Sequence, residues 1–305
     1  MIKVLAADIG GTNIRASVVT EQGQIKQCVR SQIDLGDKNL SEDDLVERLA
    51  AFFFGILKNE TSIKAIGMGF PGFFMGDTGL LVASPNLPNL HNVELAKRLS
   101  IELNLPVHLQ NDALCAAVGE HTYGAGKGST NLLHVTLGTG IGGGLILNNM
   151  PYTGENGMAM ELGHLRVAYD NAARSCGCGG SGCVEAYASA TAIATKYFEV
   201  SGIRVDAKQV YDRACKNERD AINVFESAGY YLGVAIAQSI KLLDIKTVTI
   251  SGGLTGAWQI LYPAIVSSLD TELIAPLKGK VKVLRSALDD NAGIFGAAAI
   301  AQKMV

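Results

Sequence analysis

The strongest constraint on the fold is a pattern that occurs twice: an apolar strand, a glycine-rich turn, and a second strand directly after it. In the first half, KVLAADI (3–9) leads into DIGGTN (8–13), and IRASVVT (14–20) follows. In the second half, NLLHVTL (131–137) leads into GTGIGGG (138–144) and then GLILNN (144–149). Turns this short join antiparallel strands. The repetition predicts two related α/β domains that face one another across a cleft.

Helices and strands alternate through the rest of each half, with a turn-rich stretch, HTYGAGKGST (121–130), between the halves. We therefore predict an N-terminal domain over 1–115, completed by a C-terminal helix (291–305), and a second domain over 116–290. Further strands are expected at 24–30, 64–70, 107–110, 247–251 and 281–284. Helices are expected at 41–58 (with Ser41 as N-cap), 93–103, 113–124, 184–198, 206–216, 218–243, 257–270 and 293–303.

Size and charge exclude several classes of protein. A chain of 305 residues corresponds to about two domains at roughly 150 residues each. The net charge of −3 provides no basic surface for nucleic acid or an anionic membrane. No apolar run approaches the roughly 18 residues of a membrane span, and the apolar start before Asp8 is too short for a signal peptide. We expect a soluble, cytoplasmic protein without nucleic-acid or membrane partners.

Three glycine loops follow apolar strands: DIGGTN (8–13), GTGIGGG (138–144) and SGGLTG (251–256). Glycine lets backbone N–H groups approach phosphate oxygens closely. A carboxylate beside such a loop, as at Asp8, would repel phosphate unless Mg²⁺ lay between them. Each loop taken singly is equally well explained as a tight turn, but together they predict a nucleotide site. The candidate residues are Asp8, Gly10, Gly11, Thr12, Asn13, Gly138, Thr139, Gly140, Gly252 and Gly253.

Two specific motif assignments, a dinucleotide-binding loop and a P-loop, are rejected. Gly138, Gly140 and Gly143 fit G-x-G-x-x-G, but a strand rather than a helix follows, which excludes a dinucleotide loop. GAGKGST (124–130) resembles a P-loop but has His121 and Gly128 where the motif requires glycine and Ser or Thr. It is interpreted as a flexible turn.

A histidine and three cysteines have the spacing of a metal site: His164-x₁₁-Cys176-x-Cys178-x₄-Cys183. One imidazole and three thiolates make a closed tetrahedral zinc site, which predicts a structural role. The glycines between the cysteines allow the tight turns that such a knuckle requires. The other cysteines, Cys28, Cys115 and Cys215, are expected to be small core residues.

Several acidic and amide side chains are candidates for chemistry. Asp112 follows a strand and begins a helix, beside Asn111, at the strand end where α/β proteins place ligands; plain helix capping is the alternative. Glu161 and Glu185 flank the zinc motif, so the metal would hold both carboxylates near one place. Carboxylates suit vicinal sugar hydroxyls, although surface charge explains either one equally well. Asn86, in SPNLPNL, is a further hydroxyl partner or only a turn former.

These motifs resemble the ROK sugar kinases, within the actin/hexokinase/Hsp70-like (ribonuclease H-like) superfamily, along the whole chain. The matching segments are DIGGTN and LGTGIGGG as phosphate loops, QNDA, ELGH, CGCGGSGCVE, and SGGLTG beside the adenosine. The resemblance implies ATP-dependent phosphorylation of a hexose at its 6-hydroxyl, with Mg²⁺ and structural zinc. It makes Asp112 the general base, and Asn111, Glu161, His164 and Glu185 sugar ligands, with His164 also on zinc. A homodimer is usual in the family.

The identity of the sugar is less constrained than the class of enzyme. CVEAYASATAI (183–193) is most similar to the glucokinase branch, whereas GFPG with SPNLPNL also resembles allose kinases. N-acetylmannosamine, N-acetylglucosamine and fructose kinases stay open. The family also contains repressors, but the first phosphate loop begins at residue 8, so we expect an enzyme rather than a sugar-binding regulator; a sugar- or nucleotide-binding ATPase without transfer is a more distant alternative. Met160 stands where the family usually has glycine. The larger methionine side chain would narrow the sugar pocket or shift Glu161.

Overall fold

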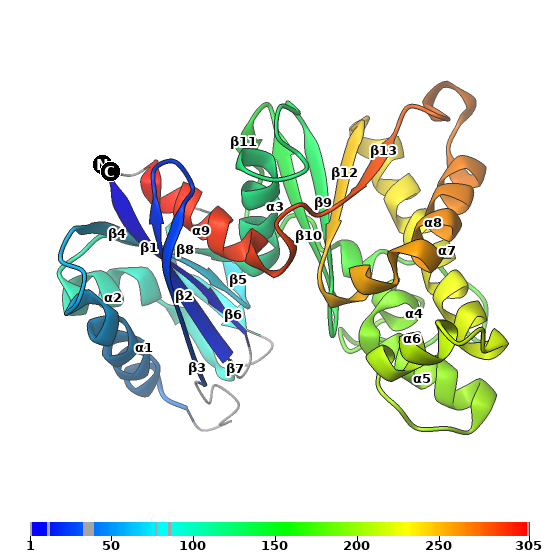
Figure 1. The fold of residues 1–305 in the computed structure, drawn as a ribbon, viewed down its shortest axis with the longest axis horizontal. Helices are drawn as coiled ribbons and strands as arrows, with labels where there is room; N and C mark the ends of the chain where they lie inside the picture. Colours follow the sequence, from blue (N-terminus) through cyan, green and yellow to red (C-terminus); the bar gives the residue numbers. More distant parts are fainter. Residues whose placement is uncertain (1, 11–12, 33–39, 77, 85–86, 304) are drawn as a thin grey trace. The chain divides into compact units, whose positions relative to one another are not determined.

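The computed structural model describes residues 2–10, 13–32, 40–76, 78–84, 87–303 and 305. The chain divides into two compact units (Figure 1). The first comprises residues 1–130, 144–159 and 291–305, and the second comprises 131–143 and 160–290. Among the described residues, no helix combines the length and apolar character needed to cross a membrane.

The first unit is built on a five-stranded mixed sheet in the order β3-β2-β1-β4-β8. β1, β2 and β3 form the expected antiparallel meander, while β4 and β8 run parallel to β1. The carboxyl ends of β1, β4 and β8 therefore meet at one edge of the sheet, the edge at which α/β proteins bind ligands. The strands are β1 (Lys3–Ile9), β2 (Asn13–Thr20), β3 (Ile25–Gln32), β4 (Ile63–Phe70) and β8 (Val107–Asn111).

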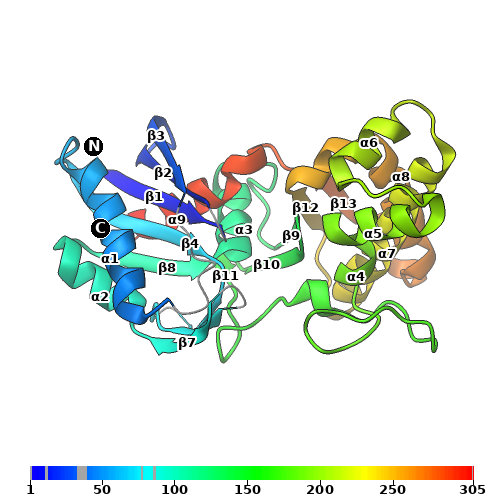
Figure 2. The ribbon, with the colours of Figure 1, turned by 90° about the horizontal axis from the view of Figure 1, so that it is seen from below.

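Helices cover both faces of this sheet (Figures 1 and 2). Side chains alternate between the faces of β1: Leu5 and Ala7 pack with α1 and α2, while Val4 and Ala6 pack with α3 and α9. The helices are α1 (Glu42–Leu57), α2 (Leu95–Leu103), α3 (Asp112–Thr122) and α9 (Ala292–Gln302). The predicted N-cap at Ser41 is present at the start of α1, where it forms a capping box with Asp44.

Two glycines let α3 and α9 touch backbone to backbone. A Cβ added to Gly119 would lie 2.2 Å from the carbonyl oxygen of Ala292, and one added to Gly296 would lie 1.6 Å from that of Cys115. Only glycine fits at either position, since any side chain would overlap the facing helix. The close contact fixes α3, whose first residue is Asp112, against α9.

A small three-stranded sheet in the first unit was not predicted. It consists of β5 (Phe73–Phe74), β6 (Leu81–Ser84) and β7 (Leu87–Val93). From the sequence we expected a turn at SPNLPNL and a helix from residue 93. In the structure Leu87, Leu90 and Val93 are buried at a three-residue interval along β7. The alternation typical of a strand is thus missing from the sequence.

The second unit contains parallel strands β9, β12 and β13, in a sheet of order β11-β10-β9-β12-β13. The division between the units falls inside β10, after Gly143. The strands are β9 (Leu132–Leu137), β10 (Ile141–Leu147), β11 (Met150–Pro151), β12 (Thr247–Ser251) and β13 (Lys282–Arg285). The helices are α4 (Glu185–Ala188), α5 (Ala190–Ser201), α6 (Ala207–Ala214), α7 (Arg219–Leu243) and α8 (Trp258–Glu272).

Three expectations differ from the structure in detail. The helix expected over 184–198 is broken at Ser189, whose extended backbone and hydroxyl cap α5 through the N–H of Ala192. Residues 116–130 and 144–159 lie in the first unit, whereas they were assigned to the second domain. Of the three cysteines expected in the core, only Cys115 is buried; Cys28 and Cys215 are exposed, so that prediction was wrong for these two.

Candidate active site and metal centre

Asp8 lies at the carboxyl end of β1 and forms an ion pair with Arg15. The two residues are directly opposite in the β1–β2 register, and Arg15 Nη2 lies 2.8 Å from Asp8 Oδ2. Gly293, in the first turn of α9, faces the same carboxylate: a Cβ added there would lie 3.1 Å from Asp8 Cγ. The positive end of the α9 dipole adds to the stabilisation of this carboxylate.

Asn111 and Asp112 connect β8 to α3. Asn111 is the N-cap, since its Oδ1 accepts the N–H groups of Ala113 (3.0 Å) and Leu114 (3.1 Å). Asn111 Nδ2 also donates to the carbonyl of Gly72 at 3.2 Å. Asp112 is the first helical residue, and its Oδ1 accepts from Ala113 N at 2.8 Å. The capping that the sequence offered as the alternative role of Asp112 is thus mainly performed by its neighbour.

Asp8 and Asp112 both lie next to Gly69 of β4: Asp8 is opposite Gly69 in the β1–β4 register, and a Cβ added to Gly69 would lie 3.5 Å from Asp112 Cα. Burial raises the pKa of the Cys115 thiol well above its usual value, and the charges of Asp8 and Asp112 raise it further. Two aspartates therefore lie at one edge of the first sheet, as the strand order predicts. In such a pair, one carboxylate can bind a cation while the other accepts a proton.

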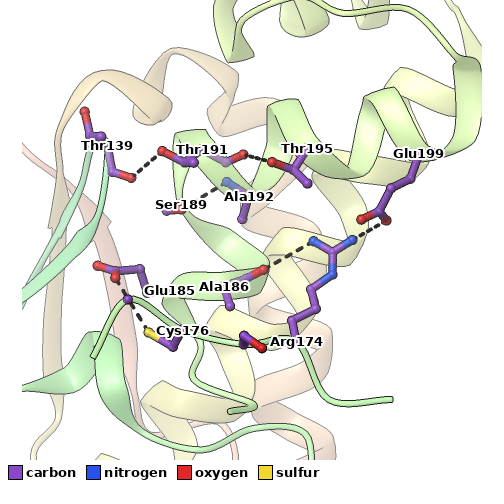
Figure 3. Close-up of a pocket in the computed structure, with 12 residues that line it drawn as sticks. Thr139, Arg174, Cys176, Glu185, Ala186, Ser189, Thr191, Ala192, Thr195 and Glu199 are labelled. Carbon is purple, nitrogen blue, oxygen red and sulfur yellow. Dashed lines mark hydrogen bonds and ion pairs between the residues drawn. The ribbon is translucent and has the colours of Figure 1, made fainter. Parts of the chain in front are cut away.

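The second glycine loop follows β9 and is fastened to the start of α5. Gly138 N donates to Gly140 O at 2.9 Å, which closes the turn. The carbonyl of Gly138 accepts from Ala190 N at 2.9 Å, and that of Thr139 accepts from Thr191 Oγ1 at 3.0 Å (Figure 3). A cavity of about 370 Å³ lies beside this loop, lined among others by Thr139, Glu185 and Thr191.

Glu185, the first residue of α4, connects this loop to the cysteine cluster. Its Oε2 accepts the N–H of Ile141 at 2.9 Å, and its Oε1 lies 3.9 Å from Cys176 Sγ. Figure 3 shows Glu185 and Cys176 pointing toward one another. Gly140 is required to be small here, since a Cβ on it would lie 2.4 Å from Glu185 Oε2.

Glu161 and His164 complete the polar group. His164 Nε2 lies 3.7 Å from Glu161 Oε2, and the opposite ring nitrogen, Nδ1, lies 3.6 Å from Cys176 Sγ. Burial raises the pKa of Glu161; the nearby His164 opposes the rise and the charge of Glu185 adds to it. The imidazole therefore has one nitrogen toward the cysteines and the other toward a carboxylate, which fits a residue that binds metal and substrate at once.

The four predicted metal ligands lie close enough together to hold one metal ion. The ligand atoms of His164, Cys176, Cys178 and Cys183 all lie within 4.8 Å of one another, and the Cys178 and Cys183 sulfurs are 3.7 Å apart. Zinc–sulfur bonds of about 2.3 Å place tetrahedral sulfur ligands about 3.8 Å apart, in agreement with this distance. Burial and the two neighbouring thiols raise the pKa of Cys183 to about 12. A bound cation would stabilise the thiolate forms of these cysteines.

Met160 has a left-handed backbone, with φ of 70°. Glycine adopts this conformation readily, whereas other residues do so at a cost of about 1–2 kcal/mol. A Cβ added to Gly143 of β10 would lie 2.4 Å from the carbonyl oxygen of Met160. The loop before Glu161 therefore packs directly on β10. Glycine would adopt this conformation without the strain that Met160 bears.

The third glycine loop begins at the end of β12. Gly252 has φ of 95°, and a Cβ on it would lie 2.2 Å from the carbonyl of Leu137, so glycine is required where the ends of β9 and β12 meet. Just before it, Ser251 Oγ bonds to Nε2 of the buried His134 at 3.0 Å, while His134 Nδ1 bonds to Thr249 Oγ1 at 2.8 Å. This network joins the two strands that carry the second and third loops.

The structure groups the predicted residues into two sets. The set in the first unit contains Asp8, Gly10, Asn13, Asn111 and Asp112. The set in the second unit contains Gly138, Thr139, Gly140, Glu161, His164, Cys176, Cys178, Cys183, Glu185, Gly252 and Gly253. Gly11, Thr12 and Asn86, also predicted, lie outside the described residues.

Arg15, His134 and the amide of Ile141 were not predicted from the sequence. Arg15 could have been predicted, because antiparallel pairing of β1 with β2 places it opposite Asp8. His134 could not, since its partners lie more than one hundred residues away.

The chain matches the ROK family over residues 4–304. It is 32% identical to the glucokinase of Thermotoga maritima, over 100% of this chain and 98% of the relative. It is 25% identical to the xylose repressor of Bacillus spizizenii, over 97% of this chain and 76% of the repressor. The crystal structure of a ROK family glucokinase from Streptomyces griseus, in complex with glucose and AMPPNP, superposes with a TM-score of 0.84 at 28% identity, covering 99% of each chain. With its fold, its loops and nearly its full length accounted for, this protein belongs to the ROK family.

Proposed function

We propose that this protein is an ATP-dependent hexose kinase whose preferred acceptor is the 6-hydroxyl of glucose. The placement of Asp8 and Asp112 on either side of Gly69, at the carboxyl edge of the first sheet, is the observation that carries the proposal. Support for glucose comes from the glucokinases of Thermotoga maritima and Streptomyces griseus, which align over essentially the whole chain.

Catalysis in this proposal depends mainly on positioning, because phosphoryl transfer requires little covalent chemistry from the protein. Asn111, Glu161, His164 and Glu185 hold the sugar hydroxyls, and Asn86 is a further candidate. The three glycine loops hold ATP through backbone N–H groups, with Gly10, Gly11, Thr12, Asn13, Gly138, Thr139, Gly140, Gly252 and Gly253 as the candidate residues.

Asp112 accepts the proton of the 6-hydroxyl as that oxygen attacks the γ-phosphoryl group. A carboxylate performs this role when it lies within hydrogen-bond reach of the hydroxyl. The start of α3 favours its ionised form, since the helix dipole stabilises an anion there. Asp8 is the residue that would hold Mg²⁺, which neutralises charge on the transferred group when bound.

We also propose that His164, Cys176, Cys178 and Cys183 hold a structural zinc ion. Four protein ligands leave no open position, so the ion supplies no chemistry of its own. It holds the ring of His164 and places Glu185 within reach of Cys176. The zinc site thereby orients two of the proposed sugar ligands.

A coupled ATP assay over a panel of hexoses tests the function. Glucose is expected to give the highest kcat/KM among glucose, allose, mannose, fructose, N-acetylmannosamine and N-acetylglucosamine. A higher value for another sugar would reassign the substrate within the kinase class. Absence of transfer to every sugar, with sugar still bound, would favour a regulator, as the similarity to a xylose repressor suggests. Sedimentation would test the homodimer that the family resemblance implies.

A further inference from the structure

Arg174 connects the cysteine cluster to the two helices that follow it. It lies two residues before Cys176, and its guanidinium group reaches across to α4 and α5 (Figure 3). Nη1 donates to the carbonyl of Ala186 in α4 at 3.3 Å, and Nη2 donates to the carboxylate of Glu199 in α5. The group also lies over the ring of Tyr187, with Cζ 5.6 Å from the ring centroid. One side chain thus contacts both helices.

The backbone of Arg174 takes part in the same connection. Its N–H donates to the hydroxyl of Tyr187 at 2.9 Å, and its carbonyl accepts from the N–H of Gly182, inside the cysteine motif, at 2.8 Å. Tyr187 in turn packs on Tyr231 of α7, with ring centroids 4.3 Å apart. The segment that leads into Cys176 is therefore fastened to α4 on one side and to the rest of the motif on the other.

The contacts of the side chain suit arginine and not lysine. A planar guanidinium can donate from separate nitrogens to a carboxylate and a carbonyl while its face lies on an aromatic ring, whereas the ammonium of lysine is a point charge. The Arg174 side chain is 21% exposed, so solvent screens its ion pair with Glu199 less than a pair on the open surface. Lys196 Nζ also lies 3.6 Å from the Glu199 carboxylate, which therefore keeps a cationic neighbour when Arg174 is replaced.

The segment that Arg174 fastens carries the cysteine nearest to two of the proposed sugar ligands. Cys176 Sγ lies 3.6 Å from His164 Nδ1 and 3.9 Å from Glu185 Oε1. A shift of this segment relative to α4 would therefore change the surroundings of His164 and Glu185 together.

We propose that Arg174 is a positioning residue: it holds the segment carrying Cys176 against α4, and so keeps the metal ligands together and Glu185 and His164 in place for the sugar. The effect on the metal rests on the cysteine cluster, whereas the effect on the sugar rests on the proposed kinase function. Arg174 acts through these residues and not on the reacting atoms. Its replacement should therefore weaken metal retention and sugar binding while phosphoryl transfer stays near its normal rate.

The variant Arg174→Lys tests the proposal, since it keeps the positive charge and removes the planar group. Zinc release from the full-length protein to a colorimetric chelator should be about tenfold faster, a usual effect of losing a group that orients metal ligands. KM for glucose should also rise about tenfold, while kcat and KM for ATP change less than about twofold. Arg204→Lys is the matched control, because Arg204 also lies over an aromatic ring, 4.6 Å from the centroid of Phe198, but outside the cluster. Neither zinc release nor KM should change in the control.

An unchanged release rate or an unchanged KM for glucose in a folded, active Arg174→Lys protein would overturn the proposal, as would a wild type that holds no zinc. A fall in kcat together with a rise in KM for ATP would also overturn it, because that pattern indicates a general loss of structure. Tyr187→Phe is the second variant should the first fail to fold: it removes the hydroxyl that accepts the N–H of Arg174, and an unchanged release rate there is equally contrary. Faster release in a protein that phosphorylates no hexose would reject the proposed function and leave the role of Arg174 at the cluster standing.

Discussion

Glu185 and Ile141 are joined by a hydrogen bond of 2.9 Å, from the backbone N–H of the second glycine loop to the carboxylate Oε2. The same carboxylate faces Cys176 through its other oxygen, 3.9 Å away. One side chain therefore links a proposed phosphate loop to a proposed zinc site. Displacement of this carboxylate should affect sugar binding before it affects anything else.

The substitution Gly140→Ala is expected to displace the Glu185 carboxylate. The new methyl group would lie 2.4 Å from Glu185 Oε2, and the end of a glutamate side chain yields more readily than backbone. We expect KM for glucose to rise about tenfold, corresponding to about 1.4 kcal/mol of lost sugar binding. Gly138→Ala is the matched control, since its methyl group meets only Gly140 O, at 4.0 Å. Equal sugar KM values for the two variants would show that Glu185 does not bind the sugar.

Asp112→Asn should lower kcat by about 10²–10⁴-fold, the usual contribution of a general base. KM for ATP should change little, because the glycine loops are untouched. The cap of α3 belongs mainly to Asn111, so Tm should stay close to that of the wild type. Near-normal turnover in a folded Asn variant would move the role of base to another carboxylate, with Glu161 the next candidate.

Cys178→Ala should remove zinc from the purified protein, as measured by elemental analysis. Structural zinc contributes folding energy directly, so Tm should also fall, and sugar binding should weaken as His164 loses its orientation. Cys215→Ala serves as the control, because that cysteine is exposed and outside the cluster. A wild-type protein free of zinc after careful purification would contradict the metal assignment.

Two substitutions at Met160 separate backbone strain from side-chain bulk. At φ of 70°, glycine is relaxed while alanine keeps the strain of a Cβ. Met160→Gly should therefore be more stable than Met160→Ala by about 1 kcal/mol, as urea unfolding would measure. In a regular helix the order would be reversed. An alanine variant as stable as the glycine variant would indicate that this backbone is not left-handed in solution.

His134 should make the fold sensitive to acid. Burial lowers its pKa from 6.5 to about 3, so the unfolded chain binds a proton over this range and the folded chain does not. The stability contributed by neutral His134 is complete above pH 6.5 and is lost as pH falls toward 3, at about 1.4 kcal/mol per pH unit. His134→Gln, unfolded in urea at pH 6.5 and 4.5, should lose less stability between the two values than the wild type. An identical loss in both proteins would contradict the prediction.

Local pattern was enough to predict most elements of the fold. The strand–turn–strand unit at residues 3–20, the capped helix from Ser41 and the long helix α7 all have signals within a few neighbouring residues. The small sheet at 73–93 lacks such a signal, since the buried residues of β7 do not alternate.

The candidate site could also be predicted only where its signals lie close together in the sequence. The zinc ligands lie within twenty residues in the sequence, and their spacing alone indicated the cluster. The bond between Glu185 and Ile141 connects positions forty-four residues apart, through a backbone donor that any residue would provide. The pairing of His134 with Ser251 depends on the neighbouring positions of β9 and β12 in the sheet. Contacts of this kind depend on tertiary structure and leave no local pattern.

The position of α9 has a consequence for how the protein is made. Residues 291–305 belong to the first unit, and Ile294, Ala297 and Ala298 pack on Val4 and Ala6 of β1. On the ribosome, the first strand emerges at the start of synthesis, but its covering helix follows only after the whole second unit has been translated. The part of this face that α9 covers, beyond the part covered by α3, thus stays exposed throughout elongation, and the second unit is complete before the first. Until release, the nascent chain exposes an apolar surface that holdase chaperones would shield.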